Sequence, residues 1–471
     1  MGELNFLSAV AMAERIRGKK ISPLELVEAH LSKIEKLNPK LNAFVHVDPA
    51  RVRREAQAAE ATVRSGNALG PLHGVPISIK SSLEVAGFRW ECGTRLRKGL
   101  IAARDAPLVA RLRAAGAIVL GVTNAPELLM AWETDNILYG RTNNPWDLER
   151  TPGGSSGGEA AAIASGMSAG GVGSDGGGSI RVPAHFSGIC GLKPTPGRIP
   201  STGHFPESGG PFALIGVVGP MARSVADLKI LFEMMQGSDD GDTCAAPVPL
   251  RWPGEEELHK LRIGYFEDDG RTPVTPETRA AVRAAAEALR HAGFQVEPFR
   301  PDGLEESRKL WMKFFVKAGG MMIGPMFQGR EADVSPILQQ FLEWSEAEPE
   351  LSAESLLDAW IRRDILRAKF LAQMRRYPIL LSPVASIPAF RHGERSWTID
   401  GKTVNYLDAW SYTEWFNLLG NPAAVVPVSH SAEGLPIGVQ IVGRPWEEEL
   451  VLAVAAALEK QCGAWKIPPI H

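Results

Sequence analysis

The amino-acid sequence predicts an α/β fold, because short strand-like runs and helical stretches alternate along the chain. From about residue 70, runs such as VPISIK and AIVLGVTN are separated by helical patterns such as APLVARLRAAG. Further on, LRIGYFED and FQVEPF flank the helical pattern PETRAAVRAAAEALRHAG, and YPILLSPVASIPAF and NPAAVVPVSH add two more strand-like runs. Alternation of this kind is typical of α/β proteins, in which helices cover a sheet.

The chain begins with a segment, residues 1–65, that we expect to be helical. Ser22, followed by Pro23 and Glu25, forms a capping box with proline at the first helical position. Apolar residues then recur on one face of the expected helix, namely Val27, Leu31 and Ile34. We therefore expect a helical layer over a larger core.

Two later segments depart from the alternation of strands and helices. Residues 235–258 are rich in turn formers and acidic residues and predict a connection on the surface. Residues 303–373 predict mostly helices, and the chain closes with the helical pattern EEELVLAVAAALEKQ.

Composition and charge exclude several classes of function. The formal net charge is -3, the isoelectric point is about 6.4, and the sequence has no long run of Lys or Arg, so we expect no nucleic acid to bind by charge. We also expect no membrane span, because no stretch reaches the roughly 18 continuous apolar residues that a spanning helix needs. The N-terminal sequence lacks the basic start and cleavage site of a signal peptide, which predicts a cytoplasmic protein.

The cysteines and histidines indicate neither disulfides nor a metal site. No C-x-x-C pair occurs among the four cysteines, which fit free thiols: Cys92, Cys190, Cys244 and Cys462. The histidines show no metal-ligand spacing, and we expect no metal ion.

Residues 151–181, TPGGSSGGEAAAIASGMSAGGVGSDGGGSIR, hold two short patterns that point to different functions. Residues 153–157 match G-x-S-x-G, which would make Ser155 the nucleophile of an α/β-hydrolase with a downstream acid and histidine. Residues 171–176 match G-x-G-x-x-G, but the acidic residue that a dinucleotide site needs about 20 positions later is missing. Such matches arise easily in a glycine-rich stretch, and we expect no cofactor.

A third pattern in the same stretch, DGGGS, ends at Ser179. Its glycines leave backbone N–H groups open to a substrate beside a hydroxyl, which is the composition of an oxyanion hole next to a nucleophile. The same glycines also fit a turn that packs a strand against a helix. A base would complete the site, and Lys80 ends the strand-like run PLHGVPISIK, where it either stays buried or turns to solvent.

Several of these stretches together resemble the amidase signature family of serine hydrolases. The resemblance rests on PLHGVPISIK, TNNPWDLERTPGGSSGGEAAAIASG and GSDGGGSIRVPAHFSGICGLKPT, and it extends to NLLGNPAAVVPV and GLPIGVQIVGRPWEEELVL. It implies a large twisted mixed β-sheet covered on both faces by helices. It also implies four segments: an N-terminal helical layer (1–65), the signature core (66–240), a variable helical and α/β insertion that shapes the substrate pocket (241–374), and a C-terminal part of the core (375–471).

Carried over residue by residue, the resemblance implies a Ser-Ser-Lys triad. Ser179 would be the nucleophile, Ser155 the bridging serine in a cis peptide, and Lys80 the base. The backbone N–H groups of four residues would form the oxyanion hole: Gly176, Gly177, Gly178 and Ser179. Three residues match positions that support the site by hydrogen bonds, namely Ser156, Asp175 and Arg181, and structural roles are left for Ser165, Ser168 and Ser174.

The base must be neutral to accept a proton. An ordinary lysine has a pKa of about 10.4, so that at pH 7 only about one in a few thousand is neutral. We therefore expect Lys80 to be desolvated, because burial disfavours the charged form.

The activity that the resemblance implies is hydrolysis of amide bonds in a small-molecule substrate with an apolar portion. Aryl amides, esters and carbamates are further candidate substrates, and the expected state is a monomer or homodimer. Two alternatives stay open, the glutaminase subunit of a tRNA-dependent amidotransferase and an α/β-hydrolase-type esterase that uses Ser155.

Candidate pocket residues come from two stretches rich in methionine and aromatic residues. PELLMAWETDNILYG supplies Met130 and Trp132, and LWMKFFVKAGGMMIGPMFQG supplies Phe314 and Phe315, although the second stretch also fits helices that pack on the core. Gly176 stands where the family commonly has Thr or Ile. We interpret this glycine as extra room at the oxyanion loop, suited to bulkier carbonyl groups such as carbamates.

Overall fold

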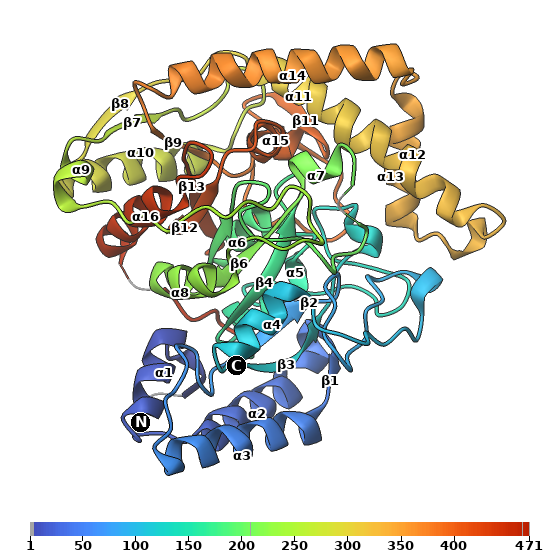
Figure 1. Ribbon diagram of the computed structural model, residues 1–471. Coiled ribbons are helices and arrows are strands. Elements are labelled where there is room, and N and C mark those ends of the chain that lie inside the picture. Colours follow the sequence, from blue (N-terminus) through green and yellow to red (C-terminus); the bar gives the residue numbers. More distant parts are fainter. Residues whose placement is uncertain (1–3, 208, 464, 471) are drawn as a thin grey trace.

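A single mixed sheet of 11 strands forms the centre of the protein, whose computed structural model describes residues 4–207, 209–463 and 465–470 (Figure 1). The strands follow one another across the sheet in this order: β1 (Phe44–Val47), β3 (Ile118–Thr123), β2 (Pro76–Lys80), β4 (Gly170–Asp175), β6 (Val217–Ala222), β5 (Cys190–Lys193), β12 (Ala423–His430), β13 (Pro436–Val442), β9 (Ile379–Pro383), β7 (Arg262–Tyr265) and β8 (Gln295–Pro298). Strand β2 runs parallel to β3 and β4, and β7 runs parallel to β8 and β9. The other neighbours are antiparallel. The predicted α/β class and mixed sheet are confirmed.

Helices cover both faces of the sheet. Alternate residues of a strand point to opposite faces, and in β12 Ala424 and Val426 join one apolar cluster while Ala423 and Val425 join another. The first cluster includes α1 (Ala9–Arg17), α4 (Pro107–Ala114), α8 (Val225–Met235), α10 (Pro276–His291) and α16 (Glu448–Cys462). The second includes α5 (Gly157–Ala164), α6 (Arg181–Ser187), α11 (Leu304–Trp311), α12 (Ala318–Ile323), α13 (Pro336–Ala347), α14 (Ala353–Gln373) and α15 (Ser411–Leu418).

The N-terminal segment is helical as predicted, with one addition. Helices α2 (Pro23–Leu41) and α3 (Pro49–Ser65) pack together, and the capping box holds: Ser22 Oγ accepts from the Glu25 N–H at 3.0 Å and Glu25 accepts from the Ser22 N–H at 2.8 Å. Helix α2 is capped at its C-terminus by Asn42, which adopts the left-handed conformation (φ 51°) and redirects the chain. Strand β1 follows and pairs antiparallel with β3 at the edge of the sheet. The predicted helical layer therefore also supplies one edge strand.

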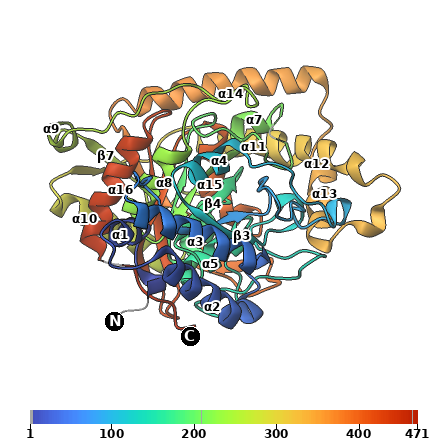
Figure 2. The same ribbon diagram turned by 60° about the horizontal axis from the view of Figure 1, so that its bottom comes forward.

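The later segments follow the sequence prediction closely. Strands β7 and β8 flank α10 in parallel, and residues between 303 and 373 form a run of helices in which Met312–Lys317 is π-helical. Figures 1 and 2 show α12 and α13 projecting from one side of the molecule, with α14 lying along another edge. Because β7 and β8 belong to the central sheet, the segment 241–374 contributes to the core as well as to its cover. The division of the chain into four segments stays a prediction.

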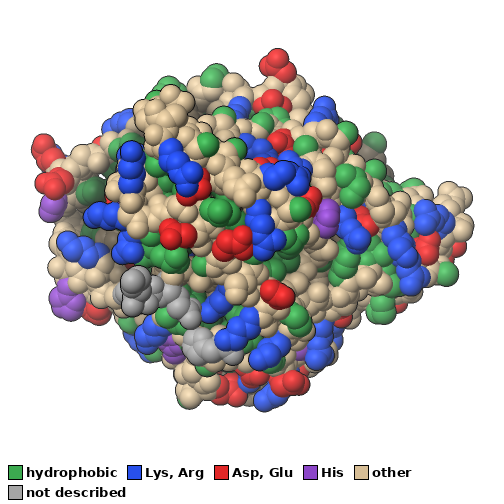
Figure 3. Space-filling view, turned by 90° about the horizontal axis from the view of Figure 1, so that it is seen from below, with side chains coloured by type: hydrophobic (Ala, Val, Ile, Leu, Met, Phe, Trp, Pro, Cys, Tyr) green, Lys and Arg blue, Asp and Glu red, His purple; other side chains and the backbone are tan. Residues whose placement is uncertain are grey.

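The remaining elements are short: α7 (Phe212–Ile215), α9 (Glu255–His259), the hairpin of β10 (Ser396–Ile399) and β11 (Lys402–Asn405), and the single turns η1 (Leu4–Phe6), η2 (Arg95–Arg97), η3 (Glu127–Leu129), η5 (Gly324–Phe327), η6 (Glu331–Asp333) and η7 (Asp408–Trp410). On the face seen in Figure 3, basic and acidic side chains are interspersed. None of the helices in the described ranges has the length and apolar character to cross a membrane.

Candidate active site

Lys80, at the end of β2, brings three serines together. Its side chain is fully buried, and its Nζ lies within hydrogen-bond distance of Ser155 Oγ at 2.7 Å, Ser156 Oγ at 2.9 Å and Ser174 Oγ at 3.0 Å. The expected contact between Lys80 and Ser155 is therefore present, and Ser156 supports it. Ser174, for which only a structural role was expected, also contacts the amine. No pattern in the sequence singles out Ser174, because its contact depends on how β4 ends beside β2.

The environment of Lys80 favours the neutral amine. Burial lowers its pKa from 10.5 to about 7, against the opposing influence of Cys92, Asp175 and Glu159. Glu159, in α5, is itself buried and accepts hydrogen bonds from Ser78 Oγ at 2.5 Å and Thr123 Oγ1 at 2.7 Å. Burial raises the pKa of Glu159 to about 7. Lys80 is thus desolvated in the folded chain, as expected.

Ser155 lies in a tight turn just before α5. The Gly154–Ser155 peptide is cis, as the resemblance implied. A Cβ atom at Gly154 would lie 2.4 Å from the backbone oxygen of Glu133, which explains why glycine occupies that position. Because the Ser155 hydroxyl meets a lysine and not a histidine, the arrangement required for an α/β-hydrolase nucleophile is not the one found here.

Ser179 follows the glycine loop, residues 176–178, which joins β4 to α6. Within the part of the chain that the structure describes, the N–H groups of Gly176, Gly177 and Ser179 have no acceptor, and the Ser179 hydroxyl has no partner. Gly178 differs from the prediction, because its N–H donates to Asp175 Oδ1 at 2.7 Å and is already occupied. Three of the four expected oxyanion donors are therefore free.

The supporting pair, Asp175 and Arg181, anchors this loop. Both side chains are fully buried and lie 3.0 Å apart. Although burial opposes ionisation, the Arg181 guanidinium keeps the pKa of Asp175 well below its usual range. Asn417 in α15 donates to Asp175 Oδ1 at 3.0 Å, and Gln440 in β13 accepts from Arg181 at 3.1 Å. No pattern in the sequence identifies Asn417 and Gln440, because they lie far from the loop along the chain.

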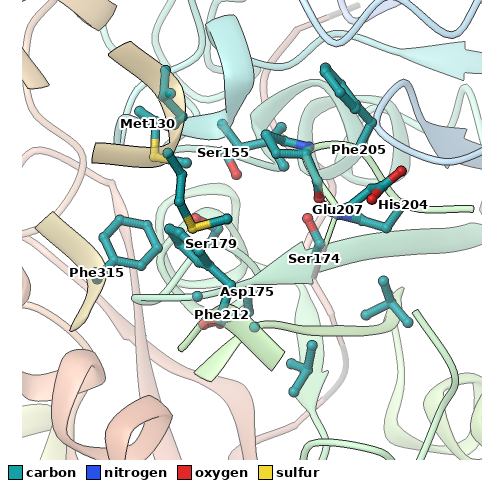
Figure 4. A pocket seen from close by; sticks show the side chains of 18 of the residues that line it. Met130, Ser155, Ser174, Asp175, Ser179, His204, Phe205, Glu207, Phe212 and Phe315 are labelled. Atoms are coloured by element: carbon teal, nitrogen blue, oxygen red, sulfur yellow. Dashed lines mark hydrogen bonds between the residues drawn. The ribbon is translucent and has the colours of Figure 1, made fainter. Parts of the chain in front are cut away.

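A cavity of about 250 Å³ opens beside these groups. In Figure 4, Met130 and Phe315 lie on one side of it and Phe205 on the other, with Ser155 and Ser179 between them. The rest of the lining is mostly apolar: Leu129, Pro206, Phe212, Gly216, Val217, Val218, Met322, Ile323 and Met326, with Ser174, Asp175, Gly176, His204 and Glu207 as the other members.

Of the four candidate pocket residues, Met130 and Phe315 line this cavity and the other two lie elsewhere. Phe314 is buried against Trp360, and Trp132 lies behind the glycine loop. No residue of the wall formed by 204–207, 212 and 216–218 was among the predicted pocket residues. The available signal was the apolar residues within the glycine- and proline-rich run HFPESGGPFALIG.

The interpretation of Gly176 as extra room is wrong. A Cβ atom at this position would lie 2.8 Å from Phe315 Cε2. The ring of Phe315 therefore occupies the space that the missing side chain leaves, and the loop gains no room for a bulkier carbonyl group.

A hydroxyl at a cavity, a buried amine of lowered pKa and free backbone N–H groups are the parts that acyl transfer to a serine requires. No group of three or more His, Cys, Asp or Glu suited to a metal ion occurs in the described ranges. Fold and site together define a hydrolase that acts on acyl bonds.

Comparison with known proteins gives the family. Residues 25–452 match the family described as Amidase, and the chain belongs to it. An indoleacetamide hydrolase of Bradyrhizobium diazoefficiens is 35% identical over 97% of this chain and 86% of its own length. An acylamidase of Rhodococcus erythropolis is 34% identical over 97% and 95%. One of the subunits of the glutamyl-tRNA(Gln) amidotransferase of Roseiflexus castenholzii is 35% identical over 98% and 96%.

The fold matches solved structures of the same family. A bacterial aryl acylamidase of the amidase signature family has a TM-score of 0.85 and 27% sequence identity, with 97% of this chain and 96% of that chain covered. The protein is an enzyme that hydrolyses amide bonds.

Proposed function

We propose that Ser179 attacks the carbonyl carbon of an amide and forms an acyl-enzyme. The attacking hydroxyl gives its proton to Ser155, which passes its own proton to neutral Lys80. The negative oxygen of the tetrahedral intermediate accepts hydrogen bonds from the free N–H groups of the glycine loop. The relay then runs backwards to protonate the leaving amine, and water releases the acyl group from Ser179.

The observation that carries this proposal is the environment of Lys80. A fully buried amine within hydrogen-bond distance of Ser155, with a pKa of about 7, is half neutral near neutral pH. A general base works best when its pKa lies near the working pH. An exposed lysine with its ordinary pKa would be a poor proton acceptor there.

The cavity supports a neutral substrate with an apolar portion. Its lining is dominated by Met, Phe, Val and Ile, and it contains no Lys or Arg among the described residues. A buried carboxylate needs a paired cation, so this cavity is unsuited to the carboxylate of glutamine. Among the two kinds of relative, this observation favours an apolar acyl or aryl amide, such as indoleacetamide, over the glutaminase reaction of an amidotransferase.

Two experiments test the proposal. Labelling with an aryl sulfonyl fluoride should modify Ser179, and Ser179→Ala should abolish hydrolysis of indoleacetamide and of anilides while the protein keeps its melting temperature. Modification of Ser155 in place of Ser179, or a folded and fully active Ser179→Ala protein, would overturn the assignment.

The substrate class is tested separately with a panel of amides, esters, carbamates and glutamine. Apolar amides should give the highest kcat/KM and glutamine none. We expect carbamates to be poor substrates, since Phe315 fills the space beside Gly176. The cytoplasmic location and the monomer-or-homodimer state stay predictions, which cell fractionation and light scattering address.

A further inference from the structure

The carbonyl groups of the glycine loop are held by tryptophan side chains. Trp311, the last residue of α11, donates its indole N–H to Gly176 O at 3.0 Å. Trp132 donates its indole N–H to Gly177 O at 2.8 Å, and Thr413 Oγ1 donates to the same oxygen at 2.9 Å. No other group in the described part of the chain donates to Gly176 O.

These contacts set the direction of the loop's N–H groups. In a trans peptide the C=O of one residue and the N–H of the next point in opposite directions. The peptides of the loop are trans, because the cis bonds of the described chain are Gly154–Ser155 and Phe205–Pro206. When Trp311 holds the Gly176 carbonyl, the Gly177 N–H must point away from the tryptophan. That N–H is one of the free donors beside Ser179.

The neighbouring peptide is held at both ends. Its carbonyl, Gly177 O, accepts from Trp132 and Thr413, and its N–H, on Gly178, donates to Asp175. This peptide therefore cannot rotate, whereas the Gly176–Gly177 peptide is held by Trp311 alone. Loss of the Trp311 hydrogen bond would therefore free one peptide, whereas loss of the Trp132 hydrogen bond would leave its peptide held by two other groups.

The rings also prevent the loop from moving toward them. Trp311 stacks on Phe315 with ring centroids 4.7 Å apart and an interplanar angle of 12°. A Cβ atom at Gly177 would lie 2.6 Å from Trp311 Cζ2, so the backbone is already in close contact with the ring. Trp311 is fully buried and has no room to change its rotamer freely.

We propose that Trp311 is a positioning residue for amide hydrolysis: its indole N–H fixes the Gly176–Gly177 peptide so that the Gly177 N–H faces the oxyanion. Trp132, together with Thr413 and Asp175, holds the next peptide, whose N–H is bound to Asp175 and so is not itself an oxyanion donor. The proposal rests on the proposed function of Ser179. It adds two residues that touch neither the substrate carbonyl nor the proton relay.

The test removes the indole N–H and keeps the aromatic ring. Trp311→Phe should lower kcat on the order of 10-fold, because a misdirected oxyanion donor loses part of the roughly 100-fold that one donor contributes. KM should change less than about twofold, since the ground-state amide carries no full negative charge. The affinity for an aryl trifluoromethyl ketone, which forms a tetrahedral adduct with the serine, should fall by the same factor as kcat. Trp132→Phe should have a smaller effect, because two other groups hold that peptide.

The chain offers a matched control in Trp410. It is buried and stacked on Trp132 with centroids 6.0 Å apart, but its indole N–H has no partner in the described part of the chain. Trp410→Phe should therefore keep kcat within about twofold. If Trp311→Phe fails to fold, 3-benzothienylalanine at position 311 keeps the bicyclic ring and replaces only the N–H with sulfur.

The outcomes separate the two proposals. Unchanged kcat in folded Trp311→Phe, with Ser179→Ala inactive, overturns the positioning role and leaves the nucleophile assignment intact. An equal loss in Trp410→Phe also overturns it, since packing and not the hydrogen bond would then explain the effect. An active Ser179→Ala protein removes the basis of both.

Discussion

The buried amine of Lys80 predicts the pH dependence of hydrolysis. Burial lowers its pKa to about 7, and the amine accepts the relay proton only when it is neutral. We expect kcat/KM for a neutral amide to rise about tenfold per pH unit below pH 7 and to become constant above it. The shift from 10.5 to about 7 means that, compared with a solvated lysine, burial disfavours the charged form relative to the neutral form by about 5 kcal/mol. A stopped-time assay with an anilide between pH 5 and 10 measures the profile.

Two other buried groups titrate in the same range and need controls. Glu159 and Lys193 both have a pKa of about 7 because of their burial. The negative charge of Glu159 raises the pKa of Lys80, so Glu159→Gln should move the midpoint below 7 and keep the slope. Lys193→Met should leave the midpoint where it is. A flat profile in Glu159→Gln, or a wild-type rate that still rises between pH 8 and 10, would refute the assignment of the base.

Three further predictions concern stability, specificity and the loop. Between pH 7 and 10.5 the unfolded chain binds a proton at Lys80 that the folded chain does not, so the free energy of unfolding rises with pH in this range. The cost of burying the charged amine is complete below pH 7 and absent above pH 10.5. Relative to wild type, the free energy of unfolding of Lys80→Met should thus fall by about 1.4 kcal/mol per pH unit from pH 7 to 10, as measured by urea titration. A difference between the two proteins that does not change with pH contradicts the lowered pKa of Lys80. Phe315→Ala should raise KM for aryl amides on the order of tenfold, by loss of apolar contact, and leave acetamide unaffected; equal changes for both would contradict the lining role. Gly177→Ala should reduce kcat at least about 100-fold, because its Cβ lies 2.6 Å from Trp311, while Gly254→Ala, with no atom near its Cβ, should have full activity.

The residues that the sequence identifies best are those close together along the chain. Ser155, Asp175 and Ser179 lie in one continuous stretch, in which the glycines form the turns that hold both serines. Lys80 lies 75 residues before Ser155, and only the family resemblance paired it with the serines; in the fold it ends β2, which neighbours β4. Local patterns point to these residues as candidates, and the family resemblance predicts the role of each one.

The contacts that the sequence does not reveal depend on tertiary packing. Trp132 was expected in the pocket, since an aromatic residue near a site fits a lining role as well as a hydrogen-bonding role. The Phe315 ring that fills the space at Gly176 comes from a helix far along the chain. The order of the strands in the sheet could not be predicted for the same reason. Strand β5 pairs with β12, for example, and no local sequence pattern indicates that pairing.

The hydrogen bonds around the Ser179 turn have a consequence for how the enzyme is made. Residues from the last part of the chain hold this turn: Thr413 contacts Gly177, Asn417 contacts Asp175, and Gln440 contacts Arg181. Synthesis releases the segment with Lys80 and both serines first, and domains fold as their segments emerge. A nascent chain that ends before these late residues holds every reacting group yet lacks the ordered backbone beside them. We therefore expect no hydrolytic activity from a chain truncated before Thr413, even though it retains Lys80, Ser155 and Ser179.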